Sequence, residues 1–255
     1  MGEVFAVSYG AGINSTAMLI GMRDRGLRPD LITFADTGAE LPETYEFLHR
    51  FAATWETWNF PALVIVRTLY QGKFEGLEGQ CLRRQELPGL AYGTRSCSTK
   101  YKGDPQDNYL KKWAKKNGVD LPIRKAIGYD AGEGHRANKK SSKPEIFTAW
   151  YPLVEWGWRR QECLKILASE GICDVPKSKC VFCPAFKKWE VVKLSRSHPE
   201  QYARGIAIER AAQATTKRGL GALWKWEDVV KADEDQVRLW ERTEQDNVNM
   251  ECGCM

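Results

Sequence analysis

Residues 4–16 read Val4-Phe5-Ala6-Val7-Ser8-Tyr9-Gly10-Ala11-Gly12-Ile13-Asn14-Ser15-Thr16, and a helix-patterned run from Ala17 to Met22 follows. The pattern predicts a buried strand that enters a helix through a turn rich in glycine and hydroxyl groups. Such a turn offers unpaired amide groups and the positive end of a helix dipole, both of which favour a phosphate group. The glycine spacing differs from those of the two commonest phosphate loops, because no Gly-Lys-Ser/Thr and no Gly-x-Gly-x-x-Gly occurs here. We therefore expect a nucleotide-phosphate site of a third kind.

The bulk composition fits one main domain. The 255 residues, 43% of them hydrophobic, suffice for one substantial core with a smaller appendage. No run has the length of a membrane span and no charged and apolar leader opens the chain, so we expect a soluble, cytoplasmic protein with no membrane partner. The formal net charge of +5 and several lysine clusters favour an acidic partner such as tRNA or DNA, although solvated helix faces explain the same pattern. The clustered lysines are Lys111, Lys112, Lys115, Lys116, Lys139, Lys140 and Lys143.

Short apolar runs alternate with helical patterns along the first half of the chain. The expected strands after the first are Leu31–Ala35, Leu63–Val66 and Arg124–Ile127, and the expected helices are Ser15–Arg25, Pro42–Trp55 and Pro105–Lys116. This order favours an α/β fold with a doubly wound parallel sheet of the Rossmann type, whose ligand lies beyond the carboxyl ends of the strands. We expect a nucleotide-binding domain over residues 1–155 and a mostly helical, cysteine-containing region over residues 156–255. Leu69–Thr99 lacks clear periodicity, so it is expected to form a long excursion or lid over the site.

A second informative stretch is Asp36-Thr37-Gly38-Ala39-Glu40-Leu41-Pro42-Glu43-Thr44-Tyr45. Asp36 falls at the carboxyl end of a predicted strand, where a carboxylate can meet a ribose hydroxyl, a magnesium ion or an attacking group. The stretch resembles the Asp-Thr-Gly-x-x-x-Pro-Glu-Thr-Tyr segment of phosphoadenosine phosphosulfate reductases. The glycine-rich turn at Ser8–Thr16 resembles the pyrophosphate loop of the adenine nucleotide alpha hydrolase superfamily, with Asn14 where many members carry Asp.

Two further segments resemble the same reductase-like family. One is Arg95–Lys102, which precedes Pro105, and the other is Ile127–Asp130 with Glu133 and Arg136. The resemblance implies that the protein binds ATP, or a sulfonucleotide, together with Mg²⁺. The nucleotide-binding residues it implies are Ser8, Tyr9, Gly10, Gly12, Asn14, Ser15, Thr16, Asp36, Thr37, Gly38, Gly128, Glu133 and Arg136. The catalytic residues it implies are Asp36, Arg95, Lys100 and Cys252.

The eight cysteines point to metal or redox chemistry rather than to a disulfide framework. Cys180-Val181-Phe182-Cys183-Pro184 has the Cys-x-x-Cys-Pro form in which thiolates ligate iron or zinc. Resemblance to adenylylsulfate reductases implies that Cys97 joins this pair on a 4Fe-4S cluster, with Cys173 or Cys81 as the fourth ligand. A structural zinc site and a redox dithiol are the alternatives, and Cys163 is expected to be a core residue.

Three functions follow as hypotheses. The first is an ATP-dependent enzyme that adenylates an acceptor and releases pyrophosphate, either in sulfur transfer with a sulfur donor or in nucleic-acid modification. The family that the chain resembles includes tRNA thiolation and DNA phosphorothioation enzymes, and related proteins accompany phage genomes and CRISPR loci. The second is a sulfonucleotide reductase in which Cys252, in a tail resembling Glu-Cys-Gly-x-His, attacks sulfur and thioredoxin resolves the intermediate. The third is a non-catalytic nucleic-acid-binding protein with structural zinc. A homodimer is left open.

Overall fold

The computed structural model describes residues 3–137 and 143–237, which form two compact units. Of the described residues, the first unit comprises 3–76, 98–137 and 143–180, and the second comprises 77–97 and 181–237. The units are therefore interleaved in sequence, whereas the sequence predicted one division after residue 155. Helix α8 (Arg160–Ser169) belongs to the first unit because it packs on α1 (Ile13–Asp24).

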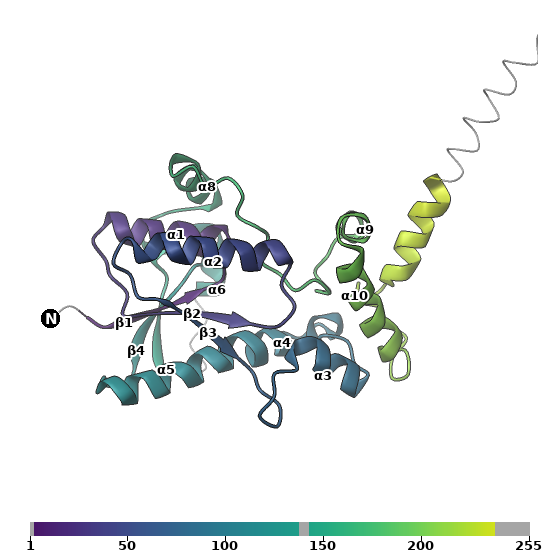
Figure 1. The fold of residues 1–255 in the computed structure, drawn as a ribbon, viewed down its shortest axis with the longest axis horizontal. Coiled ribbons are helices and arrows are strands. Elements are labelled where there is room, and N and C mark those ends of the chain that lie inside the picture. The colour runs from purple at the N-terminus through teal and green to yellow at the C-terminus, as the bar shows by residue number, and fades with distance from the viewer. Residues whose placement is uncertain (1–2, 138–142, 238–255) are drawn as a thin grey trace, which may run out of the picture. The chain divides into compact units, whose positions relative to one another are not determined.

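The first unit is built on a five-stranded sheet in which all neighbouring strands are parallel (Figure 1). The strands are β1 (Phe5–Tyr9), β2 (Leu31–Asp36), β3 (Leu63–Arg67), β4 (Ile123–Ile127) and β5 (Phe147–Trp150). Their spatial order is β3-β2-β1-β4-β5, so the direction of winding reverses between β1 and β4. This order confirms the doubly wound parallel α/β sheet, and it places a ligand-binding crevice at the carboxyl ends of β1 and β4.

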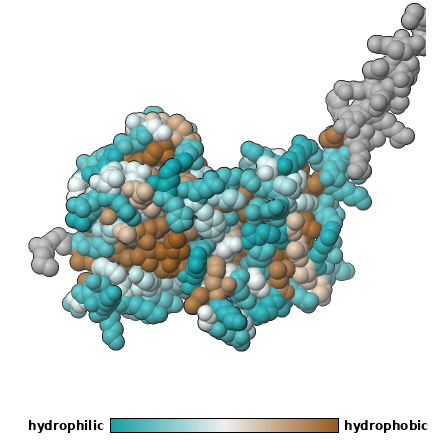
Figure 2. All heavy atoms as spheres, in the orientation of Figure 1, coloured by the Kyte–Doolittle hydropathy of each residue, from teal (hydrophilic) through white to brown (hydrophobic). Residues whose placement is uncertain are grey.

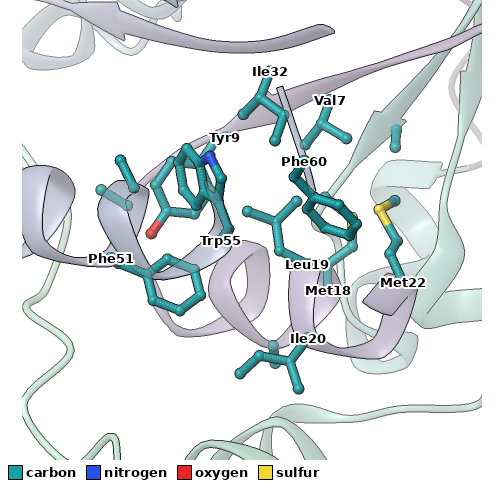
Figure 3. Packing of buried hydrophobic residues seen from close by; sticks show 14 of the residues in the cluster. Val7, Tyr9, Met18, Leu19, Ile20, Met22, Ile32, Phe51, Trp55 and Phe60 are labelled. Atoms are coloured by element: carbon teal, nitrogen blue, oxygen red, sulfur yellow. The ribbon is translucent and has the colours of Figure 1, made fainter. Parts of the chain in front are cut away.

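Helices cover both faces of the sheet, with α1 and α2 (Pro42–Glu56) on one face and α5 (Asp104–Asn117) on the other (Figure 1). Because alternate side chains of a parallel strand point to opposite faces, β1 serves two cores. Val7 and Tyr9 join the cluster under α1 and α2, and Ala6 joins the cluster over α5. Figure 3 shows Tyr9 beside Trp55 of α2, and their rings meet edge to face with centroids 5.0 Å apart.

The remaining elements connect these layers. They are α3 (Gly76–Arg84), the 3-10 turn η1 (Gly89–Tyr92), α4 (Ser96–Ser98), the π-helical turn η2 (Thr99–Gly103), the 3-10 turn η3 (Ala131–Glu133), α6 (Gly134–Ala137) and α7 (Pro152–Glu155). The stretch that the sequence predicted to be an aperiodic excursion thus contains a helix, α3, and residues 77–97 of it belong to the second unit.

The second unit is mostly helical, as expected for the C-terminal region. It contains α3, α9 (Lys188–Ser197), α10 (Pro199–Ala212) and a further helical stretch at residues 226–237. Glu209 of α10 is 1% exposed, and its carboxylate accepts hydrogen bonds from the backbone N–H groups of Leu220 and Trp226 at 2.6 and 3.0 Å. These bonds hold the turn after α10 against the helix. Within residues 3–137 and 143–237, no helix has the length and apolar character needed to span a bilayer.

Candidate functional site

The turn from β1 into α1 lies where the winding of the sheet reverses, and it places the first backbone N–H groups of α1 there. Gly12 is the N-cap of α1, and the Ser15 hydroxyl lies 3.3 Å from the backbone nitrogens of both Gly10 and Gly12. Between these glycines Ala11 has a φ of +52°, in the left-handed region that residues with a Cβ seldom adopt. Backbone strain of this kind is often found at ligand sites, which agrees with the phosphate site expected from the sequence.

The loop after β4, which carries Gly128, Glu133 and Arg136, closes on this turn. A Cβ on Gly128 would lie 3.0 Å from the Cα and 3.1 Å from the nitrogen of Ser15, so only glycine fits there without moving the turn. The Asn14 amide Nδ2 donates to Asp130 Oδ2 at 2.8 Å and to Glu133 Oε2 at 3.3 Å. Two loops far apart in sequence therefore form one polar site at the ends of β1 and β4.

Asn14 has one atom that its neighbours do not satisfy. Since Nδ2 faces two carboxylates, the other amide atom is the acceptor Oδ1, and this oxygen is buried with no hydrogen-bond partner among the described residues. Glu133 in turn pairs with Arg136, whose guanidinium lies over the Tyr129 ring at 4.0 Å. Gly132 N–H also donates to Asp130 Oδ1 at 2.8 Å. Among these side-chain oxygens, Asn14 Oδ1 is therefore the acceptor left for a ligand.

The loop after β2 is organised by Asp36, which is 3% exposed. Its Oδ1 accepts from the Tyr45 hydroxyl at 2.7 Å and from the Gly38 N–H at 2.8 Å, and its Oδ2 accepts from Arg67 Nε at 2.8 Å. Burial and the Asp36 carboxylate raise the pKa of Tyr45, so this phenol stays neutral and donates its proton. Asp36 thus fixes the conformation of the loop that carries Thr37 and Glu40.

The segment that ends in Cys180 joins the first two loops. A Cβ on Gly12 would contact Ser178 Cβ at 3.6 Å, and Cys180 Sγ lies 3.4 Å from the Thr37 hydroxyl oxygen. The backbones of Glu40 and Cys180 also form an antiparallel bridge. The glycine turn and the acidic strand end are therefore linked through one short stretch, which brings the two strongest sequence motifs into one site.

Beneath this site, polar contacts run through Gln106, which sequence reasoning missed. The Ser8 hydroxyl donates to Gln106 Oε1 at 2.6 Å, and Gln106 Nε2 donates to the carbonyl of Lys102 at 3.0 Å. Lys102 Nζ then donates to Glu40 Oε1 at 2.9 Å, while the other oxygen, Glu40 Oε2, is buried without a described partner. A buried glutamine in the first turn of a helix that also carries Pro105 was the available signal.

Three side chains predicted to bind the nucleotide form hydrogen bonds within the protein instead. Ser8 points at Gln106, and Tyr9 is 1% exposed with its hydroxyl 3.0 Å from Thr16 Oγ1, so both side chains are used inside the protein. Thr16 also donates to the Gly12 carbonyl at 2.9 Å. The backbone N–H groups of the first turn of α1 therefore remain as the groups available to a phosphate.

The other predicted catalytic residues fall in different places. Lys100 lies on η2 and lines a cavity beside Arg67, whereas Arg95 belongs to the second unit. Cys252 lies outside the described residues.

The predicted cluster ligands are divided between the units. Cys173 and Cys180 belong to the first unit, and Cys97, Cys183 and the alternative ligand Cys81 belong to the second. In the described ranges, no group of three His, Cys, Asp or Glu side chains is arranged to hold a metal ion. The 4Fe-4S cluster and its zinc alternative therefore stay predictions.

Cys163 is confirmed as a core residue and is expected to resist alkylation at pH 8 in the native protein. It is 0% exposed, and burial, with a smaller effect of Asp130, raises the pKa of its thiol to about 12, so the reactive thiolate is scarce. The exposed Cys173 is the internal control and should react under the same conditions. Peptide mapping by mass spectrometry measures both sites, and rapid labelling of Cys163 before unfolding would contradict this prediction.

Comparison with known proteins gives distant similarities. No protein-family model matches the chain. The uncharacterized protein MJ0973 of Methanocaldococcus jannaschii is 21% identical over 221 residues, which cover 84% of this chain and 49% of that protein, so the chain spans about half the length of this curated relative. Among solved structures, the chain is similar to the U34-tRNA thiolase NcsA from Methanococcus maripaludis with its 4Fe-4S cluster, with a TM-score of 0.46 and 14% identity over 84% of this chain and 74% of that one.

Proposed function

We propose that this protein is an ATP-binding enzyme of the pyrophosphatase type within the adenine nucleotide alpha hydrolase superfamily, and that it adenylates an acceptor. The observation that carries the proposal is the convergence of the glycine turn after β1 with the loop after β4, where Gly128 lies against the Ser15 backbone. The amides of this turn and the N-terminus of α1 supply the positive potential that a triphosphate needs. The resemblance of the Asp36 segment to the reductase-like branch supports an adenine nucleotide as the ligand.

The reaction is a displacement at the alpha phosphate. An acceptor oxygen forms a bond to this phosphorus while the bond to the bridging oxygen of the beta phosphate breaks, so pyrophosphate leaves with the electron pair and the acceptor loses a proton. The backbone N–H groups in the first turn of α1 hold the phosphate oxygens in place, and Arg136 adds positive charge. Positioning and charge then account for most of the rate. A sulfur or nitrogen nucleophile that replaces the adenylate releases AMP.

Magnesium fits the residues beside the phosphate turn. Asn14 Oδ1 would hold it together with the phosphates, because Mg²⁺ is bound by a few protein oxygens and substrate phosphates. The carboxylates of Asp130 and Glu133 accept from Asn14 Nδ2 and so orient this amide. The ion would neutralise charge on the leaving pyrophosphate. An asparagine in place of the usual aspartate at this position is therefore compatible with a metal role.

Cys180 is the described thiol beside the acidic loop, through its 3.4 Å contact with Thr37. We derive no step through an iron–sulfur cluster, since its predicted ligands belong to two different units. The reductase alternative depends on Cys252, for which the described residues offer no contact.

Calorimetry with the intact protein tests the proposed function. We expect ATP with Mg²⁺ to bind in the micromolar range and GTP to bind more weakly, and radiolabelled ATP should yield AMP and pyrophosphate once an acceptor is supplied. Absence of binding by ATP, AMP and both sulfonucleotides would overturn the proposal. Sulfite release from a sulfonucleotide, dependent on thioredoxin, would replace it with the reductase.

A further inference from the structure

A groove of about 610 Å³ lies in the first unit between the edge strand β3 and the start of α5. It is lined by Ile65, Val66, Arg67, Thr68, Leu69, Lys100, Asp104, Pro105, Asn108, Tyr109 and Lys112. Strand β3 pairs only with β2, so its other edge faces this groove without a neighbouring strand among the described residues. The groove is separate from the phosphate turn, and Arg67 connects it with the acidic loop through the bond to Asp36.

The charge of this groove and of the adjoining helix is positive. Lys100 and Lys112 line the groove beside Arg67, which is paired with Asp36, and the carboxylate in the lining, Asp104, is paired with Lys143 at 2.6 Å. The α5 surface next to it exposes four lysines, which form no ion pair with any described residue. These lysines are Lys111, Lys112, Lys115 and Lys116. They occupy two adjacent positions on successive turns of α5, so the positive pairs repeat about every 6 Å along the helix.

The floor of the groove is apolar and partly aromatic. Figure 2 shows hydrophobic residues gathered over β3, between α2 and the hydrophilic surface of α5. Ile65 and Leu69 are 38% and 58% exposed, and Tyr109 lines the groove. The strand continues into a turn in which Tyr70 is 42% exposed and Phe74, under the Arg67 guanidinium at 4.7 Å, is 38% exposed. Large apolar side chains at the rim of a basic surface are unusual for a face that meets only water.

We propose that this groove and the lysine face of α5 bind a single-stranded segment of nucleic acid. Repeated cations along a helix match a chain of phosphates, whose counterions are released on binding. Exposed aromatic and apolar side chains beside them match unstacked bases, which a duplex does not offer. A small anion would need neither the apolar floor nor cations spread over successive turns. The assignment deepens the proposed function, because it makes nucleic acid the acceptor and lets Arg67 join the groove to the nucleotide site.

A pair of matched charge reversals tests the groove. The variant Lys112→Glu/Lys115→Glu alters α5, and the control Arg160→Glu/Lys165→Glu alters exposed positions on α8, which packs on α1 over the opposite face of the sheet. Each double exchange lowers the formal net charge from +5 to +1, because every exchange removes one positive charge and adds one negative charge. The two variants therefore share their overall charge and differ only in the face that is changed. Thermal unfolding would be used to check that both variants remain folded.

The probes are labelled single-stranded RNA and DNA oligonucleotides of about 16 nucleotides. Fluorescence anisotropy measures their binding over a range of salt concentrations. We expect the α5 variant to bind at least about tenfold more weakly and to lose about two from the slope of log affinity against log salt, while the α8 variant stays close to the unmodified protein. Binding of either single strand counts in favour, and the relative affinities identify RNA or DNA. Equal losses in both variants, no loss in either, stronger binding of a duplex, or binding only to vesicles of anionic lipid would each overturn the assignment.

The nucleotide site is measured separately on the same variants. ATP affinity should be equal in the α5 variant and the unmodified protein, since no α5 lysine contacts the glycine turn. If no variant binds ATP but the oligonucleotide result holds, the proposed enzymatic function fails and the groove assignment stands. If ATP binds and the oligonucleotide does not, the reverse applies.

Discussion

Replacing Gly128 with valine is expected to remove measurable ATP binding while the first unit stays folded. A Cβ at this position would lie 3.0 Å from Ser15 Cα and 3.1 Å from Ser15 N, both of which are backbone atoms. Because these atoms cannot rotate away, the valine must displace the first turn of α1, whose N–H groups are proposed to hold the phosphates. We expect the Kd for ATP to rise at least about 100-fold, which corresponds to about 2.7 kcal/mol of lost binding free energy. Overpacking of this kind should lower folding stability by about 1–3 kcal/mol.

The matched control is Gly134→Val, in the same loop region. A Cβ on Gly134 meets no atom within 4 Å, and this glycine is already part of α6, so a side chain there needs no displacement. Calorimetry measures ATP affinity, and thermal unfolding measures stability, for both variants. Unaltered ATP binding by the Gly128 variant would show that the nucleotide does not use the turn between β1 and α1.

The strand and helix alternation could be predicted because buried parallel strands are apolar on both faces and so appear as continuous runs. This holds for β1 and β2, whose residues 5–7 and 31–36 are buried throughout. The edge strand β5 was not predicted, since it has only four residues and an exposed Thr148 interrupts its apolar pattern. An edge strand has fewer neighbours to bury it, and its sequence is correspondingly less distinctive.

Within the site, turns that have a local sequence signature were predictable. Contacts between elements that lie far apart in the sequence were not. The turn at Gly10–Ser15 and the loop at Gly128–Arg136 each carry a local signature, and the structure brings them together at the switch point. The Ser8–Gln106–Lys102 contacts require α5 to cross beneath β1, which no local pattern specifies. The interleaved units have the same cause, because residues 77–97 associate with segments more than eighty positions away.

Asp36→Asn is expected to have the second largest effect, through the loop that this residue holds. The carboxylate accepts from three donors, Tyr45, Gly38 and Arg67, whereas an amide keeps one accepting oxygen and turns an NH₂ group toward a donor. We expect a loss of about 2 kcal/mol in folding stability. The loop carries Thr37 and Glu40, which contact the Cys180 segment across the nucleotide site. A shift of this loop by about 1 Å should reduce pyrophosphate release about 100-fold.

Tyr45→Phe separates a functional role of Asp36 from a purely structural one. This control removes one of the three donors but leaves the carboxylate charge and the Arg67 bond, so stability should fall by about 1 kcal/mol while turnover changes little. Urea unfolding and AMP production are measured on both variants, with ATP affinity from calorimetry. If the Asp36 variant loses stability but retains turnover and ATP affinity, then Asp36 acts only in folding, and the charge at the end of β2 takes no part in the reaction.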